Sequence, residues 1–317
     1  MRKKTSFFLF VVTGCTLLLS ACFRGDMQGN TDQYPKVSNR FNIQTMDEFY
    51  DFLTFREGAY PLVSAHRGGA FPGYPENCIA TFAEVAKEMP AIIECDVRMS
   101  KDSVLVLMHD ETLNRTSTGK GKVINKTYAE LQELKLKDPS GKVTRYGIPT
   151  LEQALLWGKN AVIYTLDVKR EVPYELLVDI IRKTQSETSS IIITYTANQA
   201  AAVNRLAPDL MISASIKSMD DLTRLYGLDI PDTRLVAFVG TAEPDTSLYN
   251  NLRRHGIRSI LGTIGNLDKS AKKAGYQRYA EFVDRGADIL STDHPMEAAK
   301  ALSFYINKRN IRSKYIQ

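Results

Sequence analysis

Short apolar segments that alternate with helical stretches constrain the fold of this chain more than any other feature of its sequence. Strand-like segments are expected at Pro61–Ala65, Ala91–Val97, Ala161–Val168, Ile191–Tyr195, Leu210–Ala214, Arg234–Val239, Arg258–Leu261 and Asp288–Ser291. Helices are expected between them at Ile79–Glu88, Thr150–Trp157, Tyr174–Thr184, Asn198–Leu206, Ser218–Tyr226, Leu248–Gly256 and Ala274–Arg285. Eight such strands favour a closed α/β barrel, the (β/α)8 or TIM barrel. An open doubly wound sheet is the alternative, but no glycine-rich nucleotide loop follows any segment.

A further apolar run, Val104–Met108, does not fit this alternation. It begins too soon after Val97 for a helix to cross over between two parallel strands. We therefore expect a distorted barrel with an extra β-hairpin after the second strand. A two-residue loop at Asp102-Ser103 would place Asp96 opposite His109, on the same side of the sheet, whereas a three-residue loop would change this parity.

Two acidic residues stand near the end of the second segment. Glu94 and Asp96 are two positions apart, so both side chains project to one face of a strand. In a barrel, the inward face at this end opens on the active-site side. Two neighbouring carboxylates repel each other unless a cation lies between them, and oxygen ligands suit Ca²⁺ or Mg²⁺. Ile93 and Val97 argue against the alternative of a solvated surface strand.

The third segment adds charged residues with the same alternation. Thr165, Asp167 and Lys169 share one face. A carboxylate and an ammonium at the inner rim suit a third metal ligand and a phosphate contact. A salt bridge at the rim is the alternative.

Two of the four histidines also end apolar segments. His66 follows the first segment, and His109 ends the run that we expect in the hairpin. Two imidazoles near a bound cation can move protons on either side of a phosphorus atom. We therefore predict that both histidines are catalytic.

The residues after His66 suit an anion. Arg67 can donate to two phosphate oxygens at once, and Gly68-Gly69 allow the backbone to turn sharply beside a ligand. Glu76 and Asn77 precede the helix expected at Ile79, where they either contact the substrate or cap the helix.

The N-terminal 22 residues have the pattern of a targeting segment. Arg2-Lys3-Lys4 precede an apolar stretch, Phe7–Leu19, that is shorter than the roughly 20 residues of a membrane-spanning helix. The following Leu19-Ser20-Ala21-Cys22 resembles the bacterial lipobox. We predict a lipoprotein signal at residues 1–22 with lipid on Cys22, and a plain secretory signal is the alternative. The mature protein would then be anchored on the periplasmic or cell-surface side of a membrane.

The remaining chain is expected to form a flexible tether at residues 23–44 and a single domain at residues 45–317. Removal of Arg2, Lys3 and Lys4 lowers the formal net charge from +5 to +2, which gives no electrostatic footprint for nucleic acid. Cys78 and Cys95 then remain, which is too few for a disulfide framework and leaves one possible bridge.

Ordered motifs from about Leu62 to Ala298 resemble those of the glycerophosphodiester phosphodiesterase family, whose barrel is related to that of phosphatidylinositol-specific phospholipase C. The motifs are His66-Arg67-Gly68, Pro75-Glu76-Asn77, Glu94-Cys95-Asp96-Val97, Lys101-Asp102, His109-Asp110-Glu111-Thr112-Leu113, Arg115-Thr116, Ile148-Pro149-Thr150-Leu151-Glu152 and Thr292-Asp293-His294-Pro295. The resemblance implies a distorted barrel, one divalent cation (Ca²⁺ or Mg²⁺) and hydrolysis of glycerophosphodiesters to glycerol 3-phosphate and an alcohol.

The resemblance also implies a role for each residue. His66 and His109 would be the acid–base pair, Arg67 and Lys169 would contact phosphate, and Glu94 and Asp96 would bind metal. Asp167 stands where the family usually has the longer glutamate as third ligand. A phosphodiesterase that acts on lysophospholipid or phosphoinositide is one alternative function, and a non-catalytic surface binding module is another.

Overall fold

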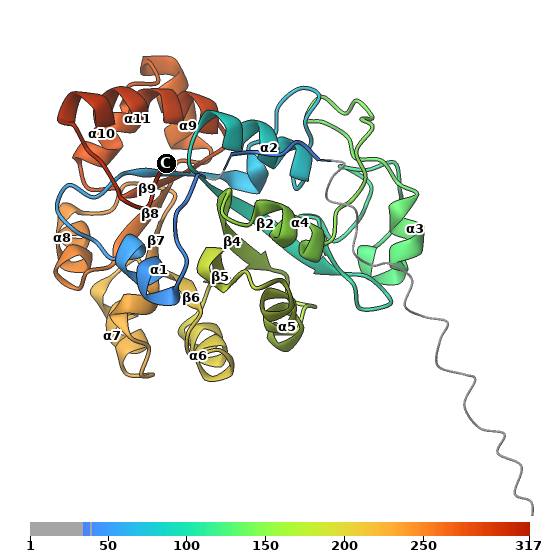
Figure 1. Ribbon diagram of the computed structural model, residues 1–317, viewed down its shortest axis with the longest axis horizontal. Helices are drawn as coiled ribbons and strands as arrows, with labels where there is room; N and C mark the ends of the chain where they lie inside the picture. The colour runs from blue at the N-terminus through green and yellow to red at the C-terminus, as the bar shows by residue number, and fades with distance from the viewer. Residues whose placement is uncertain (1–33, 39) are drawn as a thin grey trace, which may run out of the picture. The chain divides into compact units, whose positions relative to one another are not determined.

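The computed structural model describes residues 34–38 and 40–317 of the chain (Figure 1). Within these residues, eight parallel strands close into a barrel because β1 pairs with both β9 and β2. Around the barrel the strands are β1 (Leu62–Ala65), β2 (Ala91–Met99), β4 (Val162–Val168), β5 (Ser190–Thr194), β6 (Met211–Ser215), β7 (Leu235–Gly240), β8 (Arg258–Gly262) and β9 (Ile289–Thr292). The predicted (β/α)8 barrel is confirmed.

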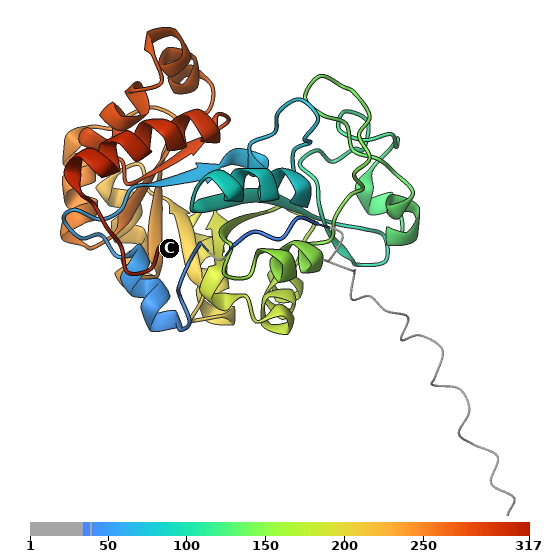
Figure 2. The same ribbon diagram turned by 45° about the horizontal axis from the view of Figure 1, so that its top comes forward.

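Helices surround the barrel in both views (Figures 1 and 2). They are α1 (Met46–Leu53), α2 (Ile79–Glu88), α3 (Tyr128–Gln132), α4 (Leu151–Gly158), α5 (Tyr174–Thr184), α6 (Ala197–Leu206), α7 (Met219–Tyr226), α8 (Thr246–Arg254), α9 (Asn266–Ala274), α10 (Arg278–Asp284) and α11 (Pro295–Arg309). The helix expected at Ala274–Arg285 is present as α10 but begins later, at Arg278, because Gly275 ends an unexpected helix, α9, with a φ of 105°. Residues 100–150 form a mostly irregular region beside the barrel, with α3 as its longest helix among the described residues.

The extra hairpin is present, but its predicted register is wrong. Strand β3 (Leu105–Leu107) runs antiparallel to β2, with Val97 opposite Leu107. The Ser100 amide donates to the Val104 carbonyl, which leaves a loop of three residues that ends at Ser103 with a φ of 62°. A three-residue hairpin loop commonly ends in such a left-handed residue. The longer loop shifts the pairing by one, so the Met108 amide, not His109, meets Asp96 across the ladder, by donating to the Asp96 carbonyl.

The barrel interior is apolar at the N-terminal ends of its strands. Each strand contributes one inward residue to a buried layer that consists of Leu62, Ile92, Ile163, Ile191, Met211, Val236, Ile260 and Ile289. Helix α1 covers this end with Phe49, Phe52 and Leu53. Thr45 caps α1 by accepting from the Glu48 amide while the Glu48 side chain accepts from the Thr45 amide. This apolar layer closes one end of the barrel, so polar chemistry is confined to the other.

The described end of the segment predicted to be a tether packs on the domain. Phe41 and Ile43 are buried with the residues of α1, and the amides of Arg40 and Phe41 donate to the Asn160 carbonyl. For residues 40–44 the predicted flexible tether is therefore wrong, because two large apolar side chains gain more by burial than the segment loses in freedom. Residues 23–33, the predicted signal and Cys22 lie outside the described residues.

Two further expectations concern membrane spans and cysteines. Among the described residues, no helix has both the length and the apolar character that a bilayer crossing demands. Cys78 and Cys95 are both buried and free, so the possible bridge between them does not form. Cys95 alternates with Glu94 and Asp96 and packs in the core outside the barrel interior.

Candidate active site

A cavity of about 220 Å³ opens at the C-terminal ends of the barrel strands. Its lining combines both predicted catalytic histidines and all three predicted metal ligands with uncharged side chains. The lining residues are Ser64, His66, Glu94, Asp96, His109, Thr165, Asp167, Ile193, Thr194, Tyr195, Ser213, Ser215, Phe238, Ile260, Ile264 and Ser291. Five predicted site residues that are distant in sequence thus line one cavity, and Arg67, which is not part of the lining, adjoins it through Asp96.

Three buried carboxylates form the acidic side of the cavity. One oxygen from each of Glu94, Asp96 and Asp167 lies within 4.8 Å of the others. Burial, reinforced by the charge of Asp96, raises the pKa of Glu94 to about 8. The Lys169 ammonium lies 2.6 Å from Asp96 Oδ1 and 2.6 Å from Asp167 Oδ2. Arg67 Nε lies 3.8 Å from Asp96 Oδ2, so two cationic side chains adjoin the cluster.

The acidic cluster fits a divalent cation. Asp167 Oδ1 is buried and accepts no hydrogen bond from any described residue, which is costly unless another group supplies positive charge. Oxygen ligands at this spacing suit Ca²⁺ or Mg²⁺, so Glu94, Asp96 and Asp167 would hold the ion. Asp167 belongs to this cluster although its side chain is shorter than glutamate.

Asn77 holds Asp96 in place. Its Nδ2 donates to Asp96 Oδ2 at 2.7 Å, and its Oδ1 accepts from the Asp96 amide at 2.9 Å. Asn77 has a φ of 54°, which asparagine tolerates better than most residues. Its predicted helix-capping role is wrong, because Cys78 is the N-cap of α2 and no side chain caps that end.

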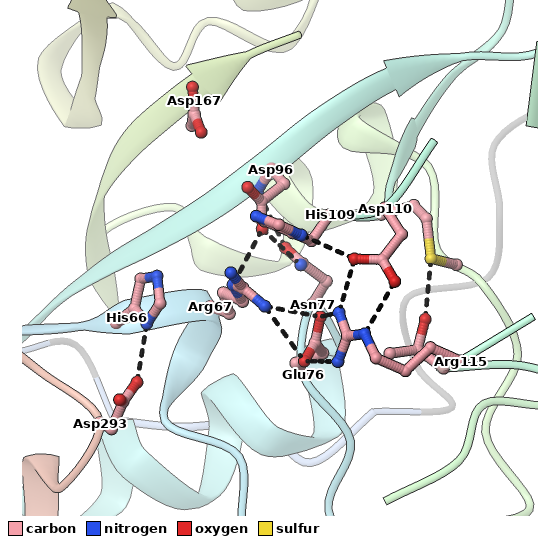
Figure 3. Close-up of polar contacts among 12 residues, drawn as sticks. His66, Arg67, Glu76, Asn77, Asp96, His109, Asp110, Arg115, Asp167 and Asp293 are labelled. Atoms are coloured by element: carbon pink, nitrogen blue, oxygen red, sulfur yellow. Dashed lines mark hydrogen bonds and ion pairs between the residues drawn. The ribbon is translucent and has the colours of Figure 1, made fainter. Parts of the chain in front are cut away.

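His66 sits at the start of a sharp turn after β1. Its Nδ1 lies 2.7 Å from Asp293 Oδ1, an acid that follows β9 (Figure 3). Burial alone would lower the pKa of His66, but the hydrogen bond with Asp293 and the charge of Glu94 together raise it. The raised pKa favours the protonated imidazole.

The turn after His66 brings the backbone amide of Arg67 to Glu94 and its side chain to Asp96. Arg67 and Gly68 have φ values of 51° and 83°, so the Arg67 amide turns inward and donates to Glu94 Oε2 at 2.7 Å. A Cβ on Gly68 would lie 2.3 Å from the ring of Phe82. Glycine is therefore required here both by the backbone angle and by the close packing of α2.

His109 reaches the cavity by a different route from the one predicted. Strand β3 ends at Leu107, and the chain then leaves the ladder, so the one-residue shift in register does not turn His109 away. Arg98 of β2 fixes this segment by donating to the His109 carbonyl from Nε at 3.0 Å. His109 Nδ1 lies 2.8 Å from Asp110 Oδ1 (Figure 3).

Glu76 does not cap α2, and its contact with substrate stays a prediction. Its carboxylate forms ion pairs with Arg67 and Arg115. The reason is electrostatic, since a mostly buried carboxylate between two guanidinium groups is far more stable than one beside a phosphate anion. Lys169 forms the salt bridges that were its alternative, and its contact with phosphate stays a prediction.

Three charged residues that support the histidines were not predicted as site residues. Asp293, Asp110 and Arg115 appeared only within the family motifs. Asp110 accepts from Arg115 as well as from His109, and Arg115 holds the pKa of Asp110 well below its usual range. Their positions in the sequence could have identified the two aspartates as site residues, because Asp110 directly follows His109 and Asp293 follows the last strand.

This geometry suits the cleavage of a phosphate ester. Two histidines, each with an aspartate partner, border a cavity whose acidic side can bind a cation, and Arg67 supplies a further positive charge. Such a site can neutralise charge that develops on a phosphorus centre and can transfer protons on both sides of it.

Comparison with known proteins agrees with the geometry. The profile of the glycerophosphoryl diester phosphodiesterase family matches residues 66–295. A crystal structure of a glycerophosphoryl diester phosphodiesterase from Parabacteroides distasonis is 34% identical, with a TM-score of 0.81 over 87% of this chain and 96% of that one. A glycerophosphodiester phosphodiesterase from Bacillus subtilis is 29% identical over 65% of this chain and 77% of its own length.

A more distant structure shares the fold. A phosphodiesterase from Oleispira antarctica, solved with the product sn-glycerol-3-phosphate, is 20% identical, with a TM-score of 0.61 over 80% of this chain and 99% of that one. The profile match covers most of the chain, and the Parabacteroides structure aligns over nearly all of the described domain. The chain therefore belongs to the glycerophosphoryl diester phosphodiesterase family and is an enzyme of that class.

Proposed function

We propose that the protein hydrolyses water-soluble glycerophosphodiesters to glycerol 3-phosphate and an alcohol, with one divalent cation and two catalytic histidines. The observation that carries this proposal is the single cavity that gathers His66, His109 and the acidic cluster. The product bound by the Oleispira antarctica relative supports the glycerol 3-phosphate part.

The chemistry follows from the charges. A phosphodiester gains about one further negative charge on its oxygens in the transition state. The cation would stabilise this charge as a Lewis acid, and the Arg67 guanidinium would donate to the same oxygens. These contacts strengthen as the charge develops, so they lower the barrier rather than merely tightening ground-state binding.

The histidines would handle the two protons of the reaction. One takes the proton from the attacking hydroxyl as the new bond to phosphorus forms, and the other gives a proton to the departing alkoxide as the old bond breaks. The attacking hydroxyl belongs either to water or to the 2-position of the glycerol, and the second route passes through a cyclic phosphate. Asp293 and Asp110 hold the imidazoles at Nδ1, which leaves Nε2 for transfer.

The test is a screen of diesters with the purified mature domain. Glycerophosphocholine, glycerophosphoethanolamine and glycerophosphoglycerol are expected to release glycerol 3-phosphate, measured by an enzyme-coupled end-point assay. Intact phosphoinositide and lysophospholipid, presented in detergent micelles, are expected to react far more slowly. Faster cleavage of the lipids would replace this substrate with the lipid alternative, and no cleavage of any diester with Ca²⁺ or Mg²⁺ present would favour the binding module.

We also propose that the mature protein is a lipoprotein held at a membrane through Cys22, on the periplasmic or cell-surface side. The lipobox-like Leu19-Ser20-Ala21-Cys22 supports this. In cells fed a labelled fatty acid, the wild-type protein is expected to carry label and to sediment with membranes. Cys22→Ser is expected to lose both properties. Cys15→Ser is the matched control, because it removes a cysteine on the discarded side of the cleavage site, and loss of label in that variant would contradict the assignment.

A further inference from the structure

We propose that Arg115 is a positioning residue that keeps Arg67 and His109 in their working positions by binding the two carboxylates next to them. This inference rests on the proposed function, in which Arg67 contacts phosphate and His109 transfers a proton. Arg115 itself does not line the cavity.

Arg115 lies between two acids and engages both with a two-pronged contact (Figure 3). Its Nη1 and Nη2 donate to Glu76 Oε2 and Oε1, each at 2.8 Å. Its Nε and Nη2 donate to Asp110 Oδ2 and Oδ1 at 2.7 and 2.8 Å. A planar guanidinium can make two such contacts at once, whereas a lysine ammonium cannot.

The contact of Arg115 with Glu76 weakens the hold of that carboxylate on Arg67, whose Nε also lies 3.8 Å from Asp96 Oδ2. Arg67 Nη1 lies 3.3 and 3.5 Å from the two oxygens of Glu76, which is longer than either contact that Arg115 makes with the same carboxylate. Glu76 is only 16% exposed, so without Arg115 it would need another cation, and Arg67 is the one beside it. A tight pair between Glu76 and Arg67 would withdraw the guanidinium from a phosphate.

The contact with Asp110 fixes His109. Asp110 Oδ1 accepts from Arg115 Nη2 and lies 2.8 Å from His109 Nδ1. An ionised carboxylate can only accept, so the Nδ1 proton lies on the histidine and Nε2 is the nitrogen left for transfer. Arg115 holds both oxygens of Asp110, including the one that pairs with His109, and the orientation of the ring therefore depends on the arginine.

The first test is Arg115→Met with glycerophosphocholine as substrate. We expect kcat/KM to fall by about 10- to 100-fold, as it does when outer partners of site residues are removed, with a higher KM and a lower kcat. Arg115→Lys keeps the positive charge but cannot make the paired guanidinium contacts. It is expected to recover only a minor part of the lost kcat/KM. The matched control is Arg285→Met, which removes an arginine of similar exposure that pairs with Glu243 far from the cavity. Its activity is expected to stay within twofold of the wild type.

Two further variants separate the two contacts. Adding Glu76→Gln to Arg115→Met removes the carboxylate that would capture Arg67, so KM is expected to return towards the wild-type value while kcat stays low. Asp110→Asn is expected to lower kcat with little change in KM. A merely structural arginine would instead lower the melting temperature of each Arg115 variant, and adding Glu76→Gln would then leave KM unrestored.

Two results would overturn the inference. One is Arg115→Met activity equal to that of Arg285→Met, and the other is an Arg115→Met KM that the second substitution leaves unchanged. Failure of the proposed function itself has a different signature, because the wild-type protein would then release no glycerol 3-phosphate.

Discussion

Replacing either His66 or His109 by alanine is expected to lower the turnover number for glycerophosphocholine by about 10²- to 10⁴-fold, the usual contribution of a positioned proton-transfer group. Each imidazole lines the cavity and is held by its own aspartate. Neither is part of the apolar core, so the variants are expected to stay folded. The measurement is steady-state release of glycerol 3-phosphate, with the melting temperature recorded for each variant.

The chain offers a matched control for this prediction. His255 also pairs with an aspartate, at 2.8 Å from Asp232, but it lies at the end of α8 away from the cavity. His255→Ala removes the same kind of pair and is expected to keep normal turnover. Turnover within tenfold of the wild type in either His66→Ala or His109→Ala would contradict the two-histidine mechanism.

Removal of divalent cations is expected to lower turnover by on the order of 10³-fold, because a metal supplies several kcal/mol of charge stabilisation and each 1.4 kcal/mol is a factor of ten. Dialysis against a chelator followed by add-back of Ca²⁺ or Mg²⁺ measures the effect directly. Binding of the ion to the folded protein alone should also raise the melting temperature in a concentration-dependent way.

Glu94→Gln separates metal binding from folding. The variant loses one negative ligand, so the rise in melting temperature on adding Ca²⁺ or Mg²⁺ is expected to shrink or vanish. In chelator, however, the variant is expected to be more stable than the wild type, because Glu94 is buried beside Asp96 and burial penalises its charge. Glu84→Gln, on the partly exposed face of α2, serves as the control and should leave the metal-induced shift intact. An unchanged shift in Glu94→Gln would remove this residue from the metal site.

The fold was readable from sequence because its main signals are local. Inward and outward residues alternate along each strand, so Glu94 and Asp96 could be assigned to one face without knowledge of their neighbours. His66 and the acids at the ends of parallel strands then had to meet, because a barrel brings the C-terminal ends of these strands to one rim. The structure confirms that these side chains share one cavity.

The structure differs from the sequence-based predictions where a single loop residue sets the strand pairing, or where a contact depends on a residue distant in the chain. A three-residue rather than a two-residue loop shifted the hairpin register, since pairing parity depends on the loop length alone. The pairing of Glu76 with Arg115 was not expected, because nothing in the local sequence places Arg115 beside it. Phe41 and Ile43 were assigned to a tether because the apolar end of the barrel that buries them is built from all eight strands.

The amino-acid sequence by itself determined the barrel, the strand ends that carry the histidines and acids, and the face on which each projects, since these depend on spacing within one segment. Only the tertiary structure decided which charges pair. His66 pairs with Asp293 from the far end of the chain, and Arg115 pairs with Glu76 from another loop, because an ion pair is selected by distance and desolvation rather than by sequence separation. For this reason the positioning role of Arg115 became visible only once the chain was folded.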